Sequence, residues 1–573
     1  MIKRRILALL TMLLTALTAV GQTYPEYFYL ATDKAFYLAG ETIWYNLHLL
    51  NGQQRVSGIA YVELTAPDGE VVQQQRLRLE EGILSGDLVL PGDLSTGYYQ
   101  LRAFTRWNLG FEPAEIEAVE LPVYQPTVPE GAPLAEVSAY EPQATHLALE
   151  LSTEQLRPRQ ALTVGLQADQ AQPGQVSLSL VHEAQVAQRE TIAERLAEVQ
   201  AAAVPSRKRS ENFAPEQSFT LTFAIDDPEG QPVTSNFIVG FVRQTQKSLQ
   251  GKAKNGRVEL AITEVYDSTV IQLFDANPFK PAYVPRVKLV QTELAAPRPA
   301  PNLARPPFTP AVVSYIQRYQ QRYQLEPLLR TGEVLAPVRQ PLARRELDPD
   351  LSFPITDFIP MENLADFANQ AVPPLQVKPF RSRSKKEPRV MGMDDPTQSI
   401  RLFVPHRDIQ TEGMFQQRPP LLMVNGYLTY DHQAVLNTTW SKVEQVDVYN
   451  DLGRLPFLFG PIGNYGVVAF RTYNNETPPR IQRAPNTVPI QGFYRGRSFT
   501  PVRQTPQTED GSRLPDFRSL LAWESPLSLD GNGQAQPITL TVGDQAGRYL
   551  LRVEGLLADG TPIVAERWIE VQR

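Results

Sequence analysis

The chain contains no cysteine, although its first residues have the pattern of a secretory signal. Residues 3–5 are basic, residues 6–17 are almost entirely apolar, and Ala19 and Gly21 are small residues at the positions that precede a cleavage site. We therefore expect residues 1–21 to be a signal peptide that is removed on export. Without cysteine there is neither a disulfide nor a thiolate metal site. Large hydrophobic cores must hold such a chain together.

The composition supports several such cores. The chain has 573 residues, of which 42% are hydrophobic, and this length suggests about four or five domains. Its 50 prolines favour strands, turns and stiff linkers over a helical bundle. The net charge of −7 is too small to indicate nucleic acid as a partner. We expect no transmembrane segment after signal cleavage, because no second apolar run is long enough to span a membrane.

Residues 22–125 have the pattern of a β-sandwich. Two aromatic, alternating segments flank a turn at Gly40-Glu41, and further short strands follow with turns between them. The spacing Thr-Asp-Lys-x-x-Tyr-x-x-Gly-Glu-x-Ile over residues 32–43 resembles the signature of the macroglobulin MG2 domain. The resemblance implies packing roles, with Tyr37 and Trp44 in the core and Gly40 in the turn, and no chemistry. A macroglobulin trap also needs a thioester cysteine, which this chain lacks.

Further strand-rich segments follow. Residues 145–290 predict a second sandwich, with a third as an open alternative, and contain an amphipathic helix that begins near Ile192. Residues 291–399 predict a proline-rich linker with short helices, and residues 476–510 predict a second linker. Residues 511–573 predict a C-terminal β domain. The pattern Gly-x-Tyr-x-Leu-Arg occurs at residues 97–102 and again at 547–552, which indicates repeated sandwich modules.

Residues 419–472 contain three blocks in a recognisable order. Residues 419–426 form an apolar run that ends in Asn-Gly, and residues 443–449 have the pattern of a half-buried strand. A glycine-rich turn at 460–466 then precedes a third strand at 467–472. This order resembles the plug domain of TonB-dependent outer-membrane receptors. Together with the MG2-like segment, it resembles a group of secreted Bacteroidetes proteins.

The resemblance implies a plug-like α+β domain at residues 400–475 that has no pore of its own. Only 101 residues follow Thr472, too few for a receptor barrel of about 22 strands. The expected fold is therefore mainly β, with several macroglobulin- or Ig-like sandwiches and this small α+β domain. The family's turns place candidate partner-binding residues at Asn425, Gly426, Tyr465 and Gly466. These residues could equally serve only backbone geometry.

No pattern for catalysis is present. The five histidines are scattered and show no metal-ligand spacing, and there is neither a Gly-x-Ser-x-Gly elbow nor a phosphate-binding loop. We therefore expect no catalytic residues, no metal and no cofactor. His48 lies in an expected strand and is interpreted as structural.

Two functions remain open. The first is a non-enzymatic exported scaffold or binding protein in the periplasm, at the outer membrane or at the cell surface. Its plug-like domain would dock on a barrel or TonB-type partner. The alternative is a carbohydrate- or peptide-binding accessory protein that uses exposed aromatic residues such as Trp107 or Trp440. The oligomeric state stays open.

Overall fold

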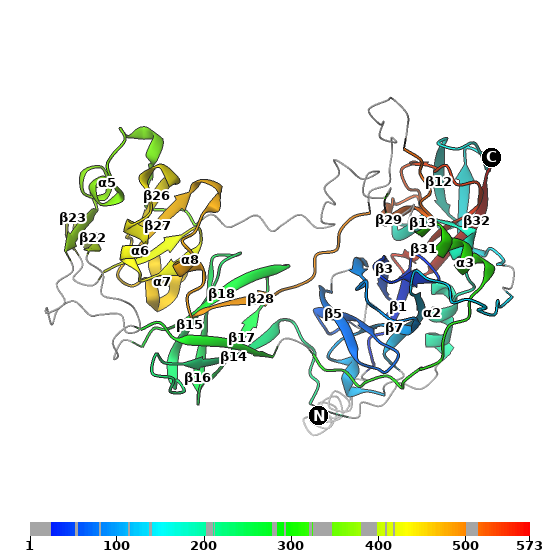
Figure 1. The fold of residues 1–573 in the computed structure, drawn as a ribbon, viewed down its shortest axis with the longest axis horizontal. Coiled ribbons are helices and arrows are strands. Elements are labelled where there is room, and N and C mark those ends of the chain that lie inside the picture. Colours follow the sequence, from blue (N-terminus) through cyan, green and yellow to red (C-terminus); the bar gives the residue numbers. More distant parts are fainter. Residues whose placement is uncertain are drawn as a thin grey trace, which may run out of the picture. The chain divides into compact units, whose positions relative to one another are not determined.

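The computed structural model divides the chain into two compact units (Figure 1). Unit 1 comprises residues 1–217, 294–339 and 494–573, and unit 2 comprises residues 218–293 and 340–493. The residues described are 24–51, 55–79, 82–112, 115–136, 140–201, 210, 212–277, 283–291, 294–319, 324, 347–379, 398–406, 409–415, 419–499 and 514–572. The expected signal peptide lies outside them.

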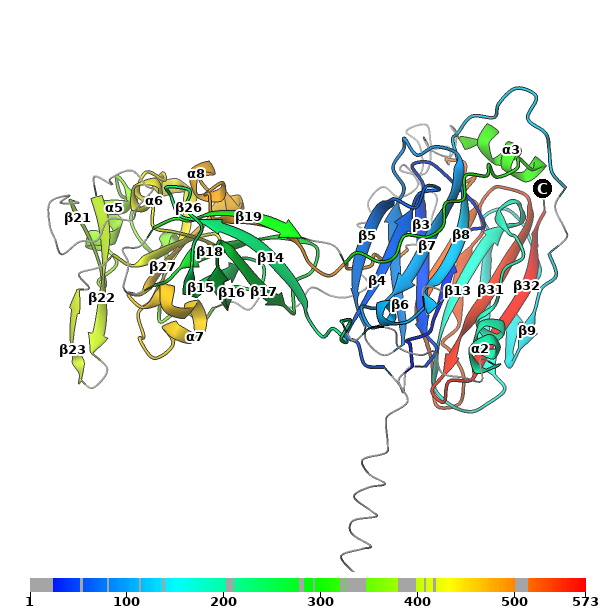
Figure 2. The same ribbon diagram turned by 90° about the horizontal axis from the view of Figure 1, so that it is seen from below.

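The first sandwich of unit 1 confirms the predicted β architecture. One sheet has the order β1-β3-β6 and the other the order β2-β8-β7-β4-β5 (Figure 2). Their strands are β1 (Phe28–Thr32), β2 (Tyr37–Leu38), β3 (Thr42–Leu49), β4 (Ile59–Thr65), β5 (Val71–Arg78), β6 (Ile83–Val89), β7 (Gly97–Phe104) and β8 (Glu117–Tyr124). Tyr37 is fully buried in the core between the sheets, and Gly40 has a φ of 88° in the turn, as expected.

Trp44 packs differently from the prediction. Its neighbours Ile43 and Tyr45 belong to the core of the first sandwich, so Trp44 points to the opposite face of β3. There its ring meets Phe499 edge-on at 5.4 Å and joins a cluster with Trp523 of the second sandwich. The expectation that Trp44 fills its own domain core was wrong, because β3 is buried on both faces.

The second sandwich is built from two segments that are far apart in the sequence. Its sheets have the orders β10-β12-β30 and β11-β32-β31-β13-β29, with β9 paired to β32. The strands are β9 (Ala144–Thr145), β10 (Leu147–Leu151), β11 (Gln155–Leu156), β12 (Ala161–Ala168), β13 (Gly174–His182), β29 (Leu520–Leu529), β30 (Ile538–Thr541), β31 (Gly547–Leu557) and β32 (Pro562–Val571). The expected separate domain at 511–573 was therefore wrong. Its apolar face is covered by β10 and β12 in one shared core.

The repeated Gly-x-Tyr-x-Leu-Arg pattern occupies the same kind of position in both sandwiches. Tyr99 of β7 donates its hydroxyl to the Ser95 carbonyl at 3.1 Å, and Tyr549 of β31 donates to the Gln545 carbonyl at 3.0 Å. Both are bonds to the residue four positions earlier, as in the tyrosine corner of Ig-like sandwiches. The repeat is therefore structural.

Two helices cover the sandwiches of unit 1. In α2 (Ile192–Ala201), Ile192 and Leu196 pack on Tyr29 of the first sandwich and on Val564 of the second. In α3 (Pro310–Gln317), the Thr309 hydroxyl accepts the Val312 amide at 3.1 Å as an N-cap, as the Thr-Pro pair predicted.

Unit 2 begins with a seven-stranded sheet of order β19-β14-β17-β16-β15-β18-β28. Its strands are β14 (Phe219–Asp226), β15 (Ser235–Val242), β16 (Lys247–Lys254), β17 (Arg257–Ile262), β18 (Ser268–Asp275), β19 (Arg286–Gln291) and β28 (Thr487–Gln491). Residues 145–290 thus contribute to both units. The expected linker at 476–510 was wrong in part, because β28 lies within it and pairs with β18.

The segment for which a plug-like domain was expected forms a second layer of unit 2, around a sheet of order β20-β26-β27-β24-β25. Its elements are β20 (Leu351–Pro354), α5 (Leu364–Gln370), β21 (Leu375–Pro379), β22 (Gln398–His406), β23 (Ile409–Phe415), β24 (Leu421–Val424), β25 (Tyr427–Thr429), α6 (His432–Leu436), β26 (Val443–Tyr449), α7 (Leu455–Phe459), β27 (Val467–Thr472) and α8 (Pro479–Gln482). The three blocks of residues 419–472 form strands, as expected, and these strands lie side by side in the sheet. The domain begins earlier than residue 400, because β20, α5 and β21 come from the expected linker at 291–399.

Candidate functional site

Both faces of the five-stranded sheet are covered by other parts of unit 2. Along β24, Leu422 and Val424 face the layer of α5 and α6, whereas Leu421 and Met423 face β15, β18 and α7. This alternation follows from the two-residue period of a strand. No face of the five-stranded sheet is therefore left for a partner among the residues that the structure describes.

The Asn425 side chain stabilises the turn that follows β24. Its Nδ2 donates to Thr472 Oγ1 at 2.8 Å, to the Glu476 carbonyl at 3.1 Å and to Thr477 Oγ1 at 3.1 Å. Its Oδ1 accepts the Thr472 amide at 3.0 Å. The residue is buried and has a φ of 48°, a left-handed conformation that Asn tolerates better than most residues. Asn425 thus ties the turn to the end of β27.

Gly426 brings the same turn against the seven-stranded sheet. Its φ is 86°, and a Cβ atom here would lie 3.2 Å from Cγ of Arg243, which follows β15. Arg243 Nε donates to the Asn425 carbonyl at 3.1 Å, and its guanidinium lies 4.5 Å from the centre of the Tyr427 ring. The turn is therefore a contact between the two layers of unit 2.

A side chain from the seven-stranded sheet also satisfies the edge strand β25. Gln272 of β18 donates Nε2 to the Leu428 carbonyl at 2.9 Å and accepts the Leu428 amide at 2.6 Å. The amide side chain thus replaces a neighbouring strand, which closes an edge that could otherwise pair with another chain.

Tyr465 and Gly466 lie at the other end of the sheet. In the parallel strands β24 and β27, Leu421 pairs with Val467 and Val424 pairs with Phe470. Gly466 therefore lies just before the first pair, and Asn425 lies just after the last pair. This separation is about five residues of strand, or roughly 17 Å. Gly466 has a φ of 87°, and a Cβ atom here would overlap Leu402. The four candidate residues do not form one site, and their contact with a partner stays a prediction.

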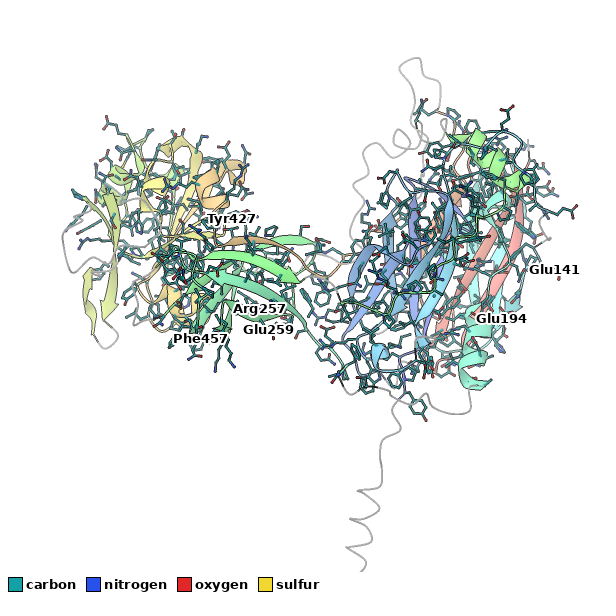
Figure 3. All side chains as sticks on the ribbon, turned by 60° about the horizontal axis from the view of Figure 1, so that its bottom comes forward. Glu141, Glu194, Arg257, Glu259, Tyr427 and Phe457 are labelled. Atoms are coloured by element: carbon teal, nitrogen blue, oxygen red, sulfur yellow. The ribbon has the colours of Figure 1, made fainter. Side chains whose placement is uncertain are left out.

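The layer around the five-stranded sheet carries an exposed apolar segment that was not expected from the sequence. Phe457 of α7 is 87% exposed and Leu452 before the helix is 39% exposed, whereas Leu455 and Phe459 are buried in the interlayer core. We call Leu452, Pro456 and Phe457 the α7 ridge. Phe457 lies at the margin of unit 2 (Figure 3). The run Leu-Pro-Phe-Leu-Phe has no polar position to indicate which side faces outward.

The histidines and tryptophans named from the sequence are mostly structural. Burial lowers the pKa of His48 to about 4 and that of His432 to about 4. Trp107 is buried and donates Nε1 to the Tyr24 carbonyl at 2.8 Å, so its expected exposure was wrong. Trp440 is half-buried against Phe367, with ring centres 4.7 Å apart.

The polar residues of the MG2-like signature bond to one another. Asp33 Oδ1 accepts the Tyr37 hydroxyl at 2.6 Å and the Trp44 amide at 2.9 Å. Lys34 Nζ lies 3.0 Å from Glu41 Oε2, and the Tyr315 hydroxyl of α3 donates to Glu41 Oε1 at 2.6 Å. Burial raises the pKa of Asp33 to about 6. The signature residues stabilise the fold of the first sandwich, as the resemblance implied.

Two classes of feature are absent from the described ranges. Within them, no group of three or more His, Asp or Glu residues is placed to hold a metal ion. No helix in that part of the chain is long and apolar enough to cross a membrane.

Comparison with known proteins gives one domain assignment. Residues 27–113 match the model of the MG2 domain. No curated protein matches the chain. Similar solved structures include the trypsin-activated alpha-2-macroglobulin of Escherichia coli (TM-score 0.24, 11% identity, 96% of this chain and 42% of that one). They also include the Salmonella alpha-2-macroglobulin reacted with methylamine (TM-score 0.23, 12% identity, 96% and 40%). A putative membrane-anchored protein from Corynebacterium diphtheriae follows (TM-score 0.14, 10% identity, 50% and 60%).

The chain spans about two fifths of the length of the alpha-2-macroglobulins that it matches. The family model lies on the first sandwich, from just before β1 to just after β7. It includes the whole of the signature at residues 32–43. The first sandwich of this chain is an MG2 domain.

Proposed function

We propose that the chain is an exported, non-enzymatic scaffold whose plug-like domain docks on an outer-membrane protein, either a barrel or a TonB-type component. The observation that carries the proposal is the α7 ridge. It is an exposed apolar segment on a domain whose sheet is covered on both faces. The compartment follows from the expected signal peptide, and the partner class follows from the plug resemblance.

The α7 ridge has the properties of a binding anchor. Burying a fully exposed Phe side chain stabilises a complex by about 1.5–3 kcal/mol, and aromatic anchors of this kind dominate many interfaces. Leu455 and Phe459 hold α7 in the interlayer core from the other side. The ridge is therefore presented on a fixed support, which lowers the entropy lost on binding.

A scaffold role is supported by the buried polar residues, because their hydrogen bonds are made within the protein. The signature residues of the MG2 domain bond to one another, Asn425 ties the turn after β24 to the end of β27, and Gln272 joins the two layers of unit 2. His48 and His432 stay neutral at physiological pH because burial lowers their pKa values. These groups serve the fold, and the exposed side chains of the α7 ridge are the ones that we assign to contact with a partner.

Fractionation of cells that produce the protein tests this proposal. We expect the wild type in the outer-membrane fraction and the double variant Leu452→Ser/Phe457→Ser largely in the soluble fraction. Ile359→Ser is a matched control, because Ile359 is 79% exposed on the same unit but outside the ridge. Equal membrane recovery of the wild type and the double variant would contradict docking through the ridge.

A further inference from the structure

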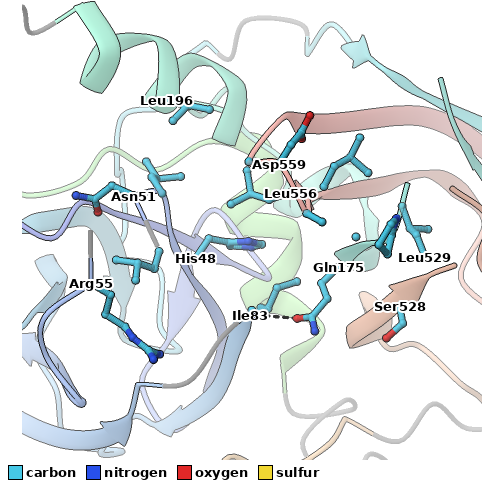
Figure 4. A pocket seen from close by; sticks show the side chains of 18 of the residues that line it. His48, Asn51, Arg55, Ile83, Gln175, Leu196, Ser528, Leu529, Leu556 and Asp559 are labelled. Atoms are coloured by element: carbon cyan, nitrogen blue, oxygen red, sulfur yellow. Dashed lines mark hydrogen bonds between the residues drawn. The ribbon is translucent and has the colours of Figure 1, made fainter. Parts of the chain in front are cut away.

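A cavity of about 850 Å³ in unit 1 is lined by residues of both sandwiches, His48 among them (Figure 4). Its wall mixes polar and apolar residues, and its two charged side chains already have partners. Arg55 donates Nη1 to the Leu79 carbonyl at 3.1 Å, and Asp559 Oδ1 accepts the Thr561 amide at 2.9 Å. Such a wall selects no class of ligand. A surface of unit 2, in contrast, carries charged side chains that have no partner.

This surface is the outer face of the seven-stranded sheet over β14, β16, β17 and β19. Residues along β17 alternate, so that Arg257 and Glu259 are exposed whereas Val258 and Leu260 are buried. Arg257 and Glu259 lie at the surface of unit 2 (Figure 3). The buried residues face the core, so the exposed residues of these strands share the outer face.

Basic residues from three strands lie in one row on this face. In the strand register, Ala224 of β14 lies between Lys288 of β19 and Arg257 of β17. Arg257 in turn lies opposite Lys254 of β16. Neighbouring strands are about 4.8 Å apart, so the row extends about 14 Å across the sheet. We call the exposed residues Lys254, Arg257 and Lys288 the basic row.

The basic row is not neutralised by the fold. Among the described residues, none of its three side chains forms an ion pair, whereas Lys247 at the other end of β16 pairs with Glu264. Like charges directly opposite each other destabilise a sheet, and Arg257 and Lys254 are such a pair. A bound anion would remove this repulsion. The row therefore has the charge of a site for an anionic partner.

The small side chain of Ala224 leaves room between the two cations that flank it. Lys288 and Arg257 are two strand spacings apart, roughly 10 Å, and Ala224 places only a methyl group between them. Thr222 lies two residues earlier on the same face, and its hydroxyl makes no hydrogen bond to another described residue. An anionic group above Ala224 would thus meet a cation on each side and a hydroxyl beside it.

Glu259 distinguishes between kinds of anionic partner. It is exposed and lies opposite Thr222, in the row next to the basic row. A carboxylate repels a uniformly anionic surface such as a lipid bilayer, but it accepts hydrogen bonds from hydroxyl groups. Interfacial membrane binding also needs an apolar side, whereas these two rows present basic, hydroxyl and carboxylate groups. A polymer that carries both anionic groups and hydroxyls fits them.

We propose that the basic row binds an acidic polysaccharide. One carboxylate or sulfate group lies over Ala224 between Lys288 and Arg257, and neighbouring sugar hydroxyls bond to Thr222 and Glu259. The site belongs to the seven-stranded sheet and does not depend on docking through the α7 ridge. It gives unit 2 a second binding surface of different chemistry.

Polygalacturonate, a polymer of carboxylated sugars, tests the proposal with the full chain, and neutral dextran is its control. We expect saturable binding to polygalacturonate that weakens as salt is added, and none to dextran. Arg257→Gln/Lys288→Gln should weaken binding about tenfold, the effect of two exposed charge contacts. Lys378→Gln/Arg483→Gln removes the same charge at exposed positions of unit 2 outside the row and should not alter binding.

A single acidic variant tests the contacts with sugar hydroxyls. Glu259→Ala makes the face more positive, yet it should weaken binding of polygalacturonate about threefold, because a hydrogen-bond acceptor is lost. Glu229→Ala, at an exposed turn, should not weaken it. Stronger binding in Glu259→Ala would overturn the hydroxyl contacts.

Two further outcomes would overturn the whole proposal. The first is absence of saturable binding to polygalacturonate, or wild-type affinity in Arg257→Gln/Lys288→Gln. The second is tighter binding to vesicles that contain phosphatidylglycerol than to polygalacturonate, which would assign the basic row to a lipid surface. Circular dichroism checks the folding of each variant, and all substituted side chains are exposed.

Discussion

The two units join their layers by different means. In unit 1, Arg189 precedes α2, pairs with Glu554 of β31 and donates to the Thr32 carbonyl at 2.8 Å. Tyr29 of the first sandwich donates to the same Glu554 at 2.8 Å. In unit 2 the interlayer core is apolar, and its polar links at Gln272, Arg243 and Asn425 include only one charged residue.

This difference determines what each junction contributes to stability and to the correct pairing of its two layers. A buried ion pair gains little net stability because desolvation of the charges opposes their attraction, although it fixes which surfaces meet. Apolar burial stabilises in proportion to its area. We therefore expect unit 2 to depend mainly on its interlayer hydrophobic side chains, and unit 1 on correctly matched charges in addition to the apolar clusters around Trp44 and Tyr29.

The largest expected effect is the loss of Phe459. This residue is fully buried, stacks on Phe241 at 6.0 Å and meets Tyr449 edge-on at 5.4 Å. Phe459→Ala should lower the free energy of unfolding of unit 2 by about 3–5 kcal/mol. Phe457→Ala, two residues away and exposed, should change it by less than about 0.5 kcal/mol. Urea unfolding can be followed through Trp440, which is the one tryptophan of unit 2. Similar losses in both variants would refute the apolar junction.

Removal of the Asn425 side chain should have the next largest effect. Asn425→Ala loses four hydrogen bonds and leaves the Thr472 amide unpaired, which predicts a loss of about 2–3 kcal/mol. Asn474 also has a positive φ, of 57°, but is exposed. Asn474→Ala therefore measures the backbone strain alone, about 1 kcal/mol. If the two variants lost equal stability, the side-chain bonds of Asn425 would contribute nothing.

Acid should destabilise unit 2 more than unit 1. Burial lowers the folded-state pKa of His432 to about 4, below the unfolded value of 6.5, so stability is lost as the pH falls through that window. At pH 5 the loss should be about 2 kcal/mol. In unit 1 the lowered pKa of His48 also makes stability fall as the pH falls. Burial raises the folded-state pKa of Asp33 to about 6, so the stability that Asp33 contributes is lost as the pH rises from about 4 to 6. The two groups oppose each other there.

Hydrogen exchange at pH 7 and pH 5 measures both units in one experiment. His432→Gln should remove most of the pH dependence of unit 2, and His146→Gln, at an exposed histidine, should not alter it. A pH dependence that persists in His432→Gln would assign the effect to another group.

The smallest expected effect concerns a surface ion pair of unit 2. Lys442 Nζ lies 2.7 Å from Glu476 Oε2, but both side chains are about half exposed. Water screens such pairs, so Lys442→Ala should change stability by less than about 0.5 kcal/mol. A loss comparable to that of Asn425→Ala would mean that charged contacts matter in unit 2 as they do in unit 1.

Local features were predictable from the sequence, and long-range pairings were not. The MG2 sandwich, the strands of residues 419–472 and the cap at Thr309 follow from motifs a few residues long. The pairing of β31 with β13 does not, because a two-residue period reveals an apolar face without revealing what covers it. The same limit explains Trp44, since β3 is buried on both faces and shows no alternation.

The candidate site shows the same division between local features, which were predictable, and long-range contacts, which were not. The turns at Asn425-Gly426 and at Gly466 were correctly located, because positive φ values have a local signature. Their contacts with Arg243 and Leu402 depend on residues far away in the sequence. The exposure of Phe457 could not be inferred from a continuous apolar run. The cavity at His48 is formed by segments from β3 to β32 and has no sequence motif.

Photo-crosslinking in living cells tests the central claim most directly. A photoreactive phenylalanine analogue at position 457 should capture a barrel or TonB-type protein in the outer-membrane fraction. The same analogue at position 359 is the control. The account predicts a specific crosslinked partner from position 457 alone. Absence of any outer-membrane partner, with the protein free in the soluble fraction, would contradict docking through the plug-like domain.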